Sequence, residues 1–177
     1  MKETTAKKKF MWNMAGSLCN SLSSMLLLII VNRISGESRG GFFALAYSTA
    51  QLLFSVGGFE IRPVQSTDIK NKFTFDQYFT SRMLNCIIML ICMIGYIVVN
   101  GYTGVEALTV FWILGYRMVE AVADVYSGLF QQRERIDISG KEMLMRSGIS
   151  TITFTIILWL TDNLLYAAMT LTLTSLV

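Results

Sequence analysis

The 177-residue sequence contains no histidine, one proline and few charged side chains. The absence of histidine excludes histidine-based catalysis and histidine metal sites. Average proline usage would give about nine prolines, and only Pro63 is present. A soluble domain of this length would carry about 44 charged residues, whereas this chain has 15 basic and 12 acidic ones. With 53% hydrophobic residues the chain does not match intrinsic disorder, and we expect an integral membrane protein built of helices.

Cysteine and glycine form no chemical motif either. Cys19, Cys86 and Cys92 all lie within apolar stretches and show no CxxC spacing, so we interpret them as small packing residues. No glycine loop of the phosphate-cradling type is present. We therefore expect no metal and no cofactor, and nothing in the pattern indicates a nucleic-acid partner.

Apolar stretches long enough to cross a bilayer dominate the chain. A hydrocarbon core about 30 Å thick needs about 20 mainly apolar residues. We predict a basic cytoplasmic tail over residues 1–9 and a transmembrane bundle over 10–177, with spans at Phe10–Val31, Gly40–Phe59, Tyr78–Val99, Val105–Phe130, Met143–Leu160 and Leu164–Val177. The last reaches only about 21 Å. We expect an all-α polytopic bundle of five full helices and a truncated sixth, cut from a longer protein; the alternative for the sixth is a short interfacial or re-entrant segment.

The positions of lysine and arginine predict the orientation of these spans. Basic residues gather in the N-terminal tail, in the 59–78 connection and in the 131–141 connection, where we count Arg82 and Arg146 as flanking residues. The alternate connections contain only Arg33 and Arg39. The distribution is 12 against 2, with Arg117 left inside a span. We predict a cytoplasmic N-terminus. Its short external connections argue against an enzyme.

The span Val105–Phe130 carries a polar stripe. At about 100° per residue, six side chains fall within an arc of about 80°: Glu106, Arg117, Glu120, Asp124, Ser127 and Gln131. A charge at the centre of a membrane helix costs about 2.5–3.5 kcal/mol, so these groups face partners or a water-filled cavity. One interpretation is a structural Arg117–Glu120 pair at i, i+3. The other is a cavity in which Arg117 meets an anionic substrate while Glu120 and Asp124 balance it or couple an ion.

The first span has a second, weaker stripe. Asn13, Ser17, Asn20 and Ser24 fall within about 60° of arc. Small and amide side chains at this spacing are typical of close helix packing with interhelical hydrogen bonds. The alternative is that Asn13 and Asn20 line the same cavity as Arg117.

Two segments resemble bacterial polysaccharide flippases of the MATE-like multidrug/oligosaccharidyl-lipid/polysaccharide exporter superfamily. One is RMVEAVADVYSGLFQQRERIDISGKEMLMRSGI, which begins at Arg117 and contains Glu120, Asp124, Gly128 and Arg146. The other is RPVQSTDIKNKFTFDQYFTSR, which begins at Arg62 and ends at Arg82. Asn13 and the run SGESRGGFFALAYSTAQLLFSVGGFEIRP fit the same pattern.

The resemblance implies the N-terminal lobe of a bacterial inner-membrane transporter for O-antigen or capsule building blocks. Such a protein flips polyprenyl-pyrophosphate-linked oligosaccharide repeat units to the outer leaflet, among membrane lipids and other polysaccharide assembly proteins. The expected substrate-binding residues are Arg117, Glu120, Asp124, Asn13 and Asn20, with Glu120 and Asp124 as candidates for ion coupling. Alternatives are an ion-coupled drug or cation exporter of the same superfamily, a membrane glycosyl- or phosphotransferase subunit, or a purely structural subunit.

Overall fold

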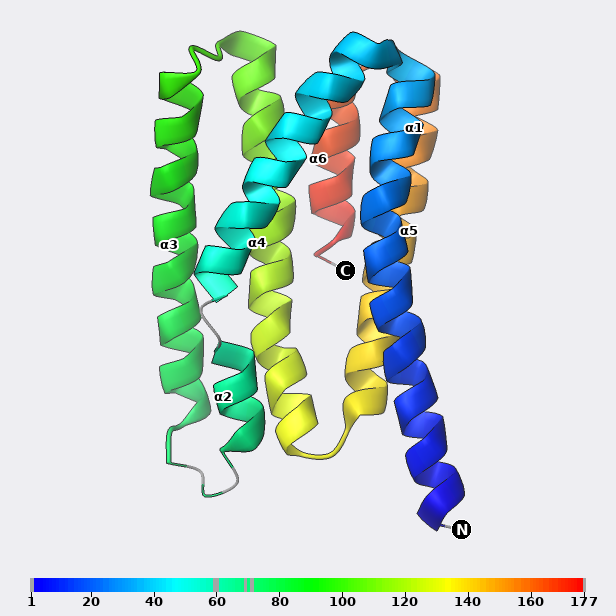
Figure 1. Ribbon diagram of the computed structural model, residues 1–177, viewed down its shortest axis with the longest axis vertical. Helices are drawn as coiled ribbons and strands as arrows, with labels where there is room; N and C mark the ends of the chain where they lie inside the picture. The colour runs from blue at the N-terminus through cyan, green and yellow to red at the C-terminus, as the bar shows by residue number, and fades with distance from the viewer. Residues whose placement is uncertain (1, 59–60, 69, 71, 177) are drawn as a thin grey trace.

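The computed structural model describes residues 2–58, 61–68, 70 and 72–176. This part of the chain forms six helices and no strand: α1 (Lys2–Gly58), α2 (Ile61–Thr67), α3 (Phe75–Val99), α4 (Gly104–Gln132), α5 (Ile136–Thr161) and α6 (Leu164–Thr174) (Figure 1). The prediction of an all-helical chain is confirmed. The span ends predicted at Phe59 and Val177 lie outside the described residues.

Helix α1 contains the first two predicted spans in one long element with a kink. The backbone at Gly36 has φ 83° and ψ 173°, a conformation that favours glycine, and the chain turns there into a second limb. We expected a loop between the two spans. The structure has a kink at Gly36 in its place, because the residues on both sides of Gly36 are helical. The helix begins at Lys2, so the expected basic tail also belongs to α1.

A polar clasp holds this kink against the corner between α5 and α6. Asp162, which has φ 45°, accepts a hydrogen bond from Ser35 Oγ at 3.2 Å. Arg39 Nη1 lies 3.0 Å from Asp162 Oδ2 and also donates to the Asp162 carbonyl oxygen at 2.8 Å. Both charged side chains are more than half exposed, so this pair contributes less than about 1 kcal/mol.

The short helix α2 lies in a segment that we expected to be a loop. Pro63 is its third residue, and proline is tolerated in the first helical turn, where its missing N–H has no intrahelical partner. The proline is therefore compatible with a short helix in this segment. Figure 1 shows α2 beside the lower half of α4.

Side-chain hydrogen bonds cap the first turns of α3 and α6. At the start of α3 the Thr74 backbone N–H donates to Gln77 Oε1 at 2.9 Å, and at the start of α6 Asn163 Oδ1 accepts from the Leu165 N–H at 3.0 Å. Gly101 and Gly104 have positive φ in the turn between α3 and α4. Helix α5 begins seven residues before the predicted Met143, which shortens the connection from α4 to residues 133–135.

Three helical stretches are long and apolar enough to cross a membrane: Ala6–Thr67, Phe75–Val99 and Ile136–Thr161. Helix α4 is 29 residues long but carries four charged side chains among its apolar ones. Helix α6 has 11 residues and rises about 16 Å, roughly half of a bilayer core. The composition and these helices identify a membrane protein of the helical class.

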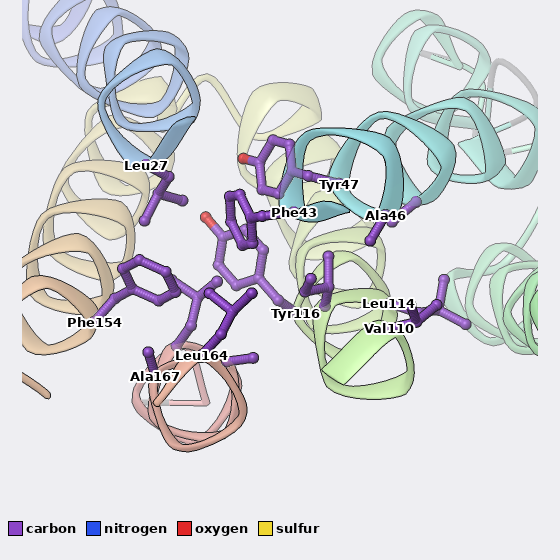
Figure 2. Packing of buried hydrophobic residues seen from close by; sticks show 14 of the residues in the cluster. Leu27, Phe43, Ala46, Tyr47, Val110, Leu114, Tyr116, Phe154, Leu164 and Ala167 are labelled. Atoms are coloured by element: carbon purple, nitrogen blue, oxygen red, sulfur yellow. The ribbon is translucent and has the colours of Figure 1, made fainter. Parts of the chain in front are cut away.

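The apolar core lies where α1, α4, α5 and α6 meet. Figure 2 shows Leu27 and Phe43 from the two limbs of α1 close to Phe154 of α5, with Tyr47 and Tyr116 beside them. The Phe43 and Phe154 ring centroids are 5.6 Å apart.

Helices α1 and α5 approach each other closely at a pair of glycines. A Cβ atom at Gly16 would overlap the backbone of Gly140, and a Cβ atom at Gly140 would overlap the backbone of Trp12. Small residues that allow backbones to approach in this way are typical of membrane helix pairs. This contact holds the first limb of α1 along α5.

All the connections that we predicted to be cytoplasmic lie at one end of the molecule. Figure 1 places the N-terminus, α2 and the connection between α4 and α5 at the bottom, and the kink of α1 and the corner between α5 and α6 at the top. At the bottom end, Lys9 Nζ donates to the Glu134 carbonyl oxygen at 2.8 Å. The predicted orientation, with this basic end in the cytoplasm, stays a prediction.

Candidate functional site

Arg117 lies near the middle of α4 and is almost completely buried, at 2% exposure. It is about 20 Å from the beginning of the helix and about 23 Å from its end, at about 1.5 Å per residue. A guanidinium group stays charged under all physiological conditions, so this depth requires partners that replace water.

Glu120 is the ionic partner of Arg117, at the i, i+3 spacing predicted from the sequence. Arg117 Nη2 also lies 3.5 Å from Ser24 Oγ, and its guanidinium carbon lies 4.4 Å from the centroid of the Tyr47 ring. The flat guanidinium group thus meets a carboxylate at its edge and an aromatic ring on its face. The structural pair that we considered for this helix is present, and it is buried.

Two further hydrogen bonds extend this pair into both limbs of α1. Asn20 Nδ2 donates to Glu120 Oε1 at 2.8 Å, and Tyr47 Oη donates to Ser24 Oγ at 2.9 Å. We call Asn20, Ser24, Tyr47, Arg117 and Glu120 the Arg117 network. Since Asn20 and Ser24 precede the Gly36 kink and Tyr47 follows it, the network ties both limbs of α1 to α4.

Asp124 belongs to a different cluster, on the side of α4 that faces α2 and α3. Its Oδ1 accepts from Arg62 Nη1 at 3.0 Å, and its Oδ2 accepts from Arg82 Nη2 at 2.8 Å. The Arg82 side chain is fully buried and that of Arg62 is 26% exposed. We call Arg62, Arg82 and Asp124 the Asp124 cluster; it joins three helices near the basic end.

The predicted polar stripe is therefore divided among several environments. Glu106 and Gln131 are exposed at opposite ends of α4, and Ser127 accepts a hydrogen bond from Ser139 Oγ at 2.8 Å. Asn13 is half-buried beside the close contact of α1 with Gly140, a placement that favours the packing interpretation for this residue. The structure brings together only Asn20, Arg117 and Glu120 of the five expected site residues.

Sequence reasoning missed the role of Arg146, which we had counted as a flanking basic residue of a loop. Its side chain is 5% exposed within α5, and its Nε donates to Glu142 Oε1 at 2.6 Å. Arg146 also interacts electrostatically with Glu120, so a second ion pair, of which the arginine is buried, lies next to the Arg117 network. The i, i+4 spacing of Glu142 and Arg146 was the available signal.

Arg82 was likewise counted as a flanking residue and lies fully buried in the Asp124 cluster. Its only signal in the sequence was its place near the start of a predicted span. Near this cluster, Gln65 of α2 is completely buried, and its side chain lies against Gly128 of α4, where a Cβ atom would overlap it. The glycine at position 128 thus allows α2 to pack on α4.

The Asp68 carboxylate organises the connection between α2 and α3. It accepts hydrogen bonds from the backbone N–H groups of Lys72 at 2.9 Å and Phe73 at 3.0 Å, and from the Tyr78 hydroxyl at 3.1 Å. These backbone hydrogen bonds hold the pKa of Asp68 below its usual value. The carboxylate shapes a loop, which explains its place in the polar 59–78 segment without any catalytic role.

Comparisons of the chain with protein families, with curated proteins and with solved structures find no match. The arrangement itself is that of a helical membrane protein with buried arginine–carboxylate pairs. Among the residues that the structure describes, no group of three or more cysteine, aspartate or glutamate side chains is placed to hold a metal ion.

Proposed function

We propose that the chain is a lobe of a transporter that flips polyprenyl-pyrophosphate-linked oligosaccharide repeat units for lipopolysaccharide or capsule assembly. The observation that carries the proposal is the burial of the Arg117 guanidinium group midway along α4, with partners from both limbs of α1. An ionisable side chain at this depth marks a substrate or ion pathway more often than a packing site. The resemblance of the segment from Arg117 to flippases supplies the substrate class.

In the proposed mechanism the pyrophosphate of the substrate takes the place of Glu120 on Arg117. Arginine pairs with phosphate oxygens through two parallel N–H donors, the same geometry with which it pairs a carboxylate. The displaced Glu120 keeps the hydrogen bond that Asn20 donates to it. The guanidinium group keeps its stacking on Tyr47. Both states thus leave the buried charge with a partner.

Partner exchange at Arg117 would couple the substrate to the shape of α1. Tyr47 lies in the second limb of α1 and Ser24 in the first, so loss or gain of their contacts with Arg117 changes the relation of the limbs about Gly36. This provides a route to alternating access, in which the glycan head group passes through the bundle while the lipid tail stays in the bilayer. Movement of two packed elements between discrete arrangements is the usual form of such transitions.

The two candidates for ion coupling differ in their surroundings. Both carboxylate oxygens of Asp124 are held by arginines, whereas Glu120 is released from Arg117 when the substrate binds. We therefore propose that Glu120 takes up the coupling proton or sodium ion, and that Asp124 holds α2 and α3 against α4. The protein would work in a bacterial inner membrane with its basic end in the cytoplasm.

Binding of a defined substrate tests this proposal. The purified chain in lipid nanodiscs should bind a polyprenyl-pyrophosphate-linked oligosaccharide, as measured by native mass spectrometry, and free inorganic pyrophosphate should compete. Absence of binding would refute the proposal. Uptake of a cationic dye into proteoliposomes in its place would favour a drug exporter, and turnover of a lipid acceptor would favour a transferase.

A further inference from the structure

A cavity of about 300 Å³ lies at the end of the bundle that contains the kink of α1. Its walls come from residues 38–42 of α1, from the first turns of α4 and from the corner between α5 and α6. Figure 1 shows the kink and this corner at the top of the molecule, at the opposite end from α2. The volume is at the lower limit of the range for small-molecule sites, about 300–1,000 Å³. The cavity therefore has room for a small polar group.

Each wall contributes one charged side chain to the cavity: Arg39, Glu106 and Asp162. Arg39 and Asp162 form the polar clasp at the kink. The third charge, on Glu106, is not balanced by this pair, so the cavity carries an excess of one negative charge. An occupant with a positively charged group is therefore favoured.

The carboxylate of Glu106 is available to such a group. Within the part of the chain that the structure describes, it accepts no hydrogen bond and forms no ion pair. Glu106 is the third residue of α4, a position from which glutamate often accepts a hydrogen bond from the backbone N–H of the capping residue. No such capping box is present at Thr103 and Glu106. The carboxylate therefore does not serve the helix end in this way, and both of its oxygens can accept from a donor in the cavity.

Arg39 also has donors that the clasp does not use. Its ion pair with Asp162 and its hydrogen bond to the Asp162 carbonyl oxygen both involve Nη1. A guanidinium group has five N–H donors, so Nε and Nη2 can serve a further acceptor. Among the described residues, Arg39 and Glu106 form no ion pair with each other. The cavity thus offers a cationic partner and an anionic partner on separate walls.

We infer that this cavity binds the head group of a zwitterionic phospholipid with a primary ammonium group, of the phosphatidylethanolamine type. The ammonium group donates to Glu106, and the phosphate accepts from Arg39. The adjoining acyl chain lies along α4, where exposed apolar side chains follow one another at intervals of three residues: Val105, Leu108 and Phe111. The site uses neither Arg117 nor transport of a substrate, so the inference goes beyond the proposed function.

Other common head groups fit this pair of partners less well. Choline carries methyl groups in place of N–H donors, so it cannot hydrogen bond to Glu106. Phosphatidylglycerol has no cationic group and would bring a second negative charge toward Glu106 and Asp162. The primary ammonium group is therefore the feature that the cavity should select.

Lipid retention in native mass spectrometry tests the inference. The chain is exchanged into nanodiscs of phosphatidylcholine that contain a small fraction of phosphatidylethanolamine with the same acyl chains. We expect retention of phosphatidylethanolamine about fivefold above its share of the bilayer, which corresponds to one ion pair at an exposed site. Retention of the two lipids in proportion to their shares would overturn the inference.

A pair of carboxylate substitutions assigns the head group. Glu106→Gln keeps the shape of the side chain and removes its charge, so it should lower the retention of phosphatidylethanolamine about fivefold. Glu37→Gln removes an exposed carboxylate of α1 that does not line the cavity, and it should leave retention unchanged. In parallel nanodiscs with phosphatidylglycerol, Glu106→Gln should lower nothing. Equal effects of the two variants, or an equal loss of both lipids in Glu106→Gln, would overturn the assignment.

A pair of tryptophan substitutions locates the site. Val105→Trp fills the cavity from a position that is 60% exposed, and it should abolish the preference for phosphatidylethanolamine. Val99→Trp is the matched control, because this valine is 85% exposed at the end of α3 and does not line the cavity. Equal retention in the two tryptophan variants would overturn the placement. Both positions are exposed, so neither change disturbs the core.

Discussion

The contact between Gly16 and Gly140 predicts opposite effects for the same substitution at two sites of α5. Gly140→Ala would place a Cβ atom against the backbone of Trp12, which cannot give way as a flexible side chain can. Gly148→Ala would add the same atom where nothing lies within 4 Å. Both glycines are in the interior of α5, so both variants gain the same helix propensity, about 1 kcal/mol in favour of alanine.

The magnitudes follow from these environments. Overpacking costs about 1–3 kcal/mol in a packed interior, and here the overlapping atoms are backbone, which favours the upper part of that range. After the gain in propensity, Gly140→Ala should lower the free energy of unfolding by about 1–2 kcal/mol. Gly148→Ala should raise it by up to about 1 kcal/mol.

Unfolding of both variants by sodium dodecyl sulfate in mixed micelles, followed by circular dichroism, measures the difference. The double variant that combines Gly16→Ala with Gly140→Ala should be less stable still, because both overlaps then occur at one helix crossing. Equal stability of the Gly140→Ala and Gly148→Ala variants would refute the close approach of α1 and α5 and with it the placement of the first limb of α1.

Two further predictions concern charged groups. Asp124→Asn should lower the free energy of unfolding by about 3–5 kcal/mol, because Arg62 and Arg82 lose the negative charge that they share. The same micelle assay measures this change. A loss below about 1 kcal/mol would contradict the proposed role of the Asp124 cluster. Asp68 has a lowered pKa in the folded protein, so its carboxylate contributes stability above its unfolded pKa, near 3.9, and this contribution is lost as the pH falls through the folded pKa. The melting temperature of Asp68→Asn should therefore lie below that of the wild type at pH 5–7, and the two should converge in acid; a constant difference down to pH 2 would contradict this role.

The sequence predicted the helices well because apolar residues dominate each of them, and the strongest signals were long apolar stretches such as Phe75–Val99. It did not predict the kink at Gly36, because polar residues on both sides of this glycine resemble a loop, although they continue the helix. It also did not predict α2, in whose first turn Pro63 lies, because the polar 59–78 segment resembles a loop.

The candidate site was predictable where it depended on local spacing. Arg117 and Glu120 are three residues apart in α4, so any helix brings them together. The partners of Asp124 come from positions 62 and 42 residues earlier in the chain, and only the packing of α2 and α3 on α4 brings them to it. No periodicity within one helix contains this information.

The removal of the buried charge at Arg117 without loss of the fold requires a paired substitution. Arg117→Gln alone would leave the Glu120 carboxylate buried without its cation, at a cost of about 3–5 kcal/mol. Arg117→Gln together with Glu120→Gln removes both charges and leaves two amides that can hydrogen bond to each other. Since a double variant of this kind restores stability without restoring the cation, it separates a structural role of the pair from substrate binding.

The affinity of this double variant for a polyprenyl-pyrophosphate-linked oligosaccharide in nanodiscs tests the central claim most directly. Loss of hydrogen bonds between a guanidinium group and pyrophosphate corresponds to about 1.5–3 kcal/mol, so the affinity should fall by roughly tenfold to a hundredfold while the free energy of unfolding stays within about 1 kcal/mol of the wild type. Wild-type affinity in a folded double variant would contradict the account and would leave the Arg117 network as a purely structural feature.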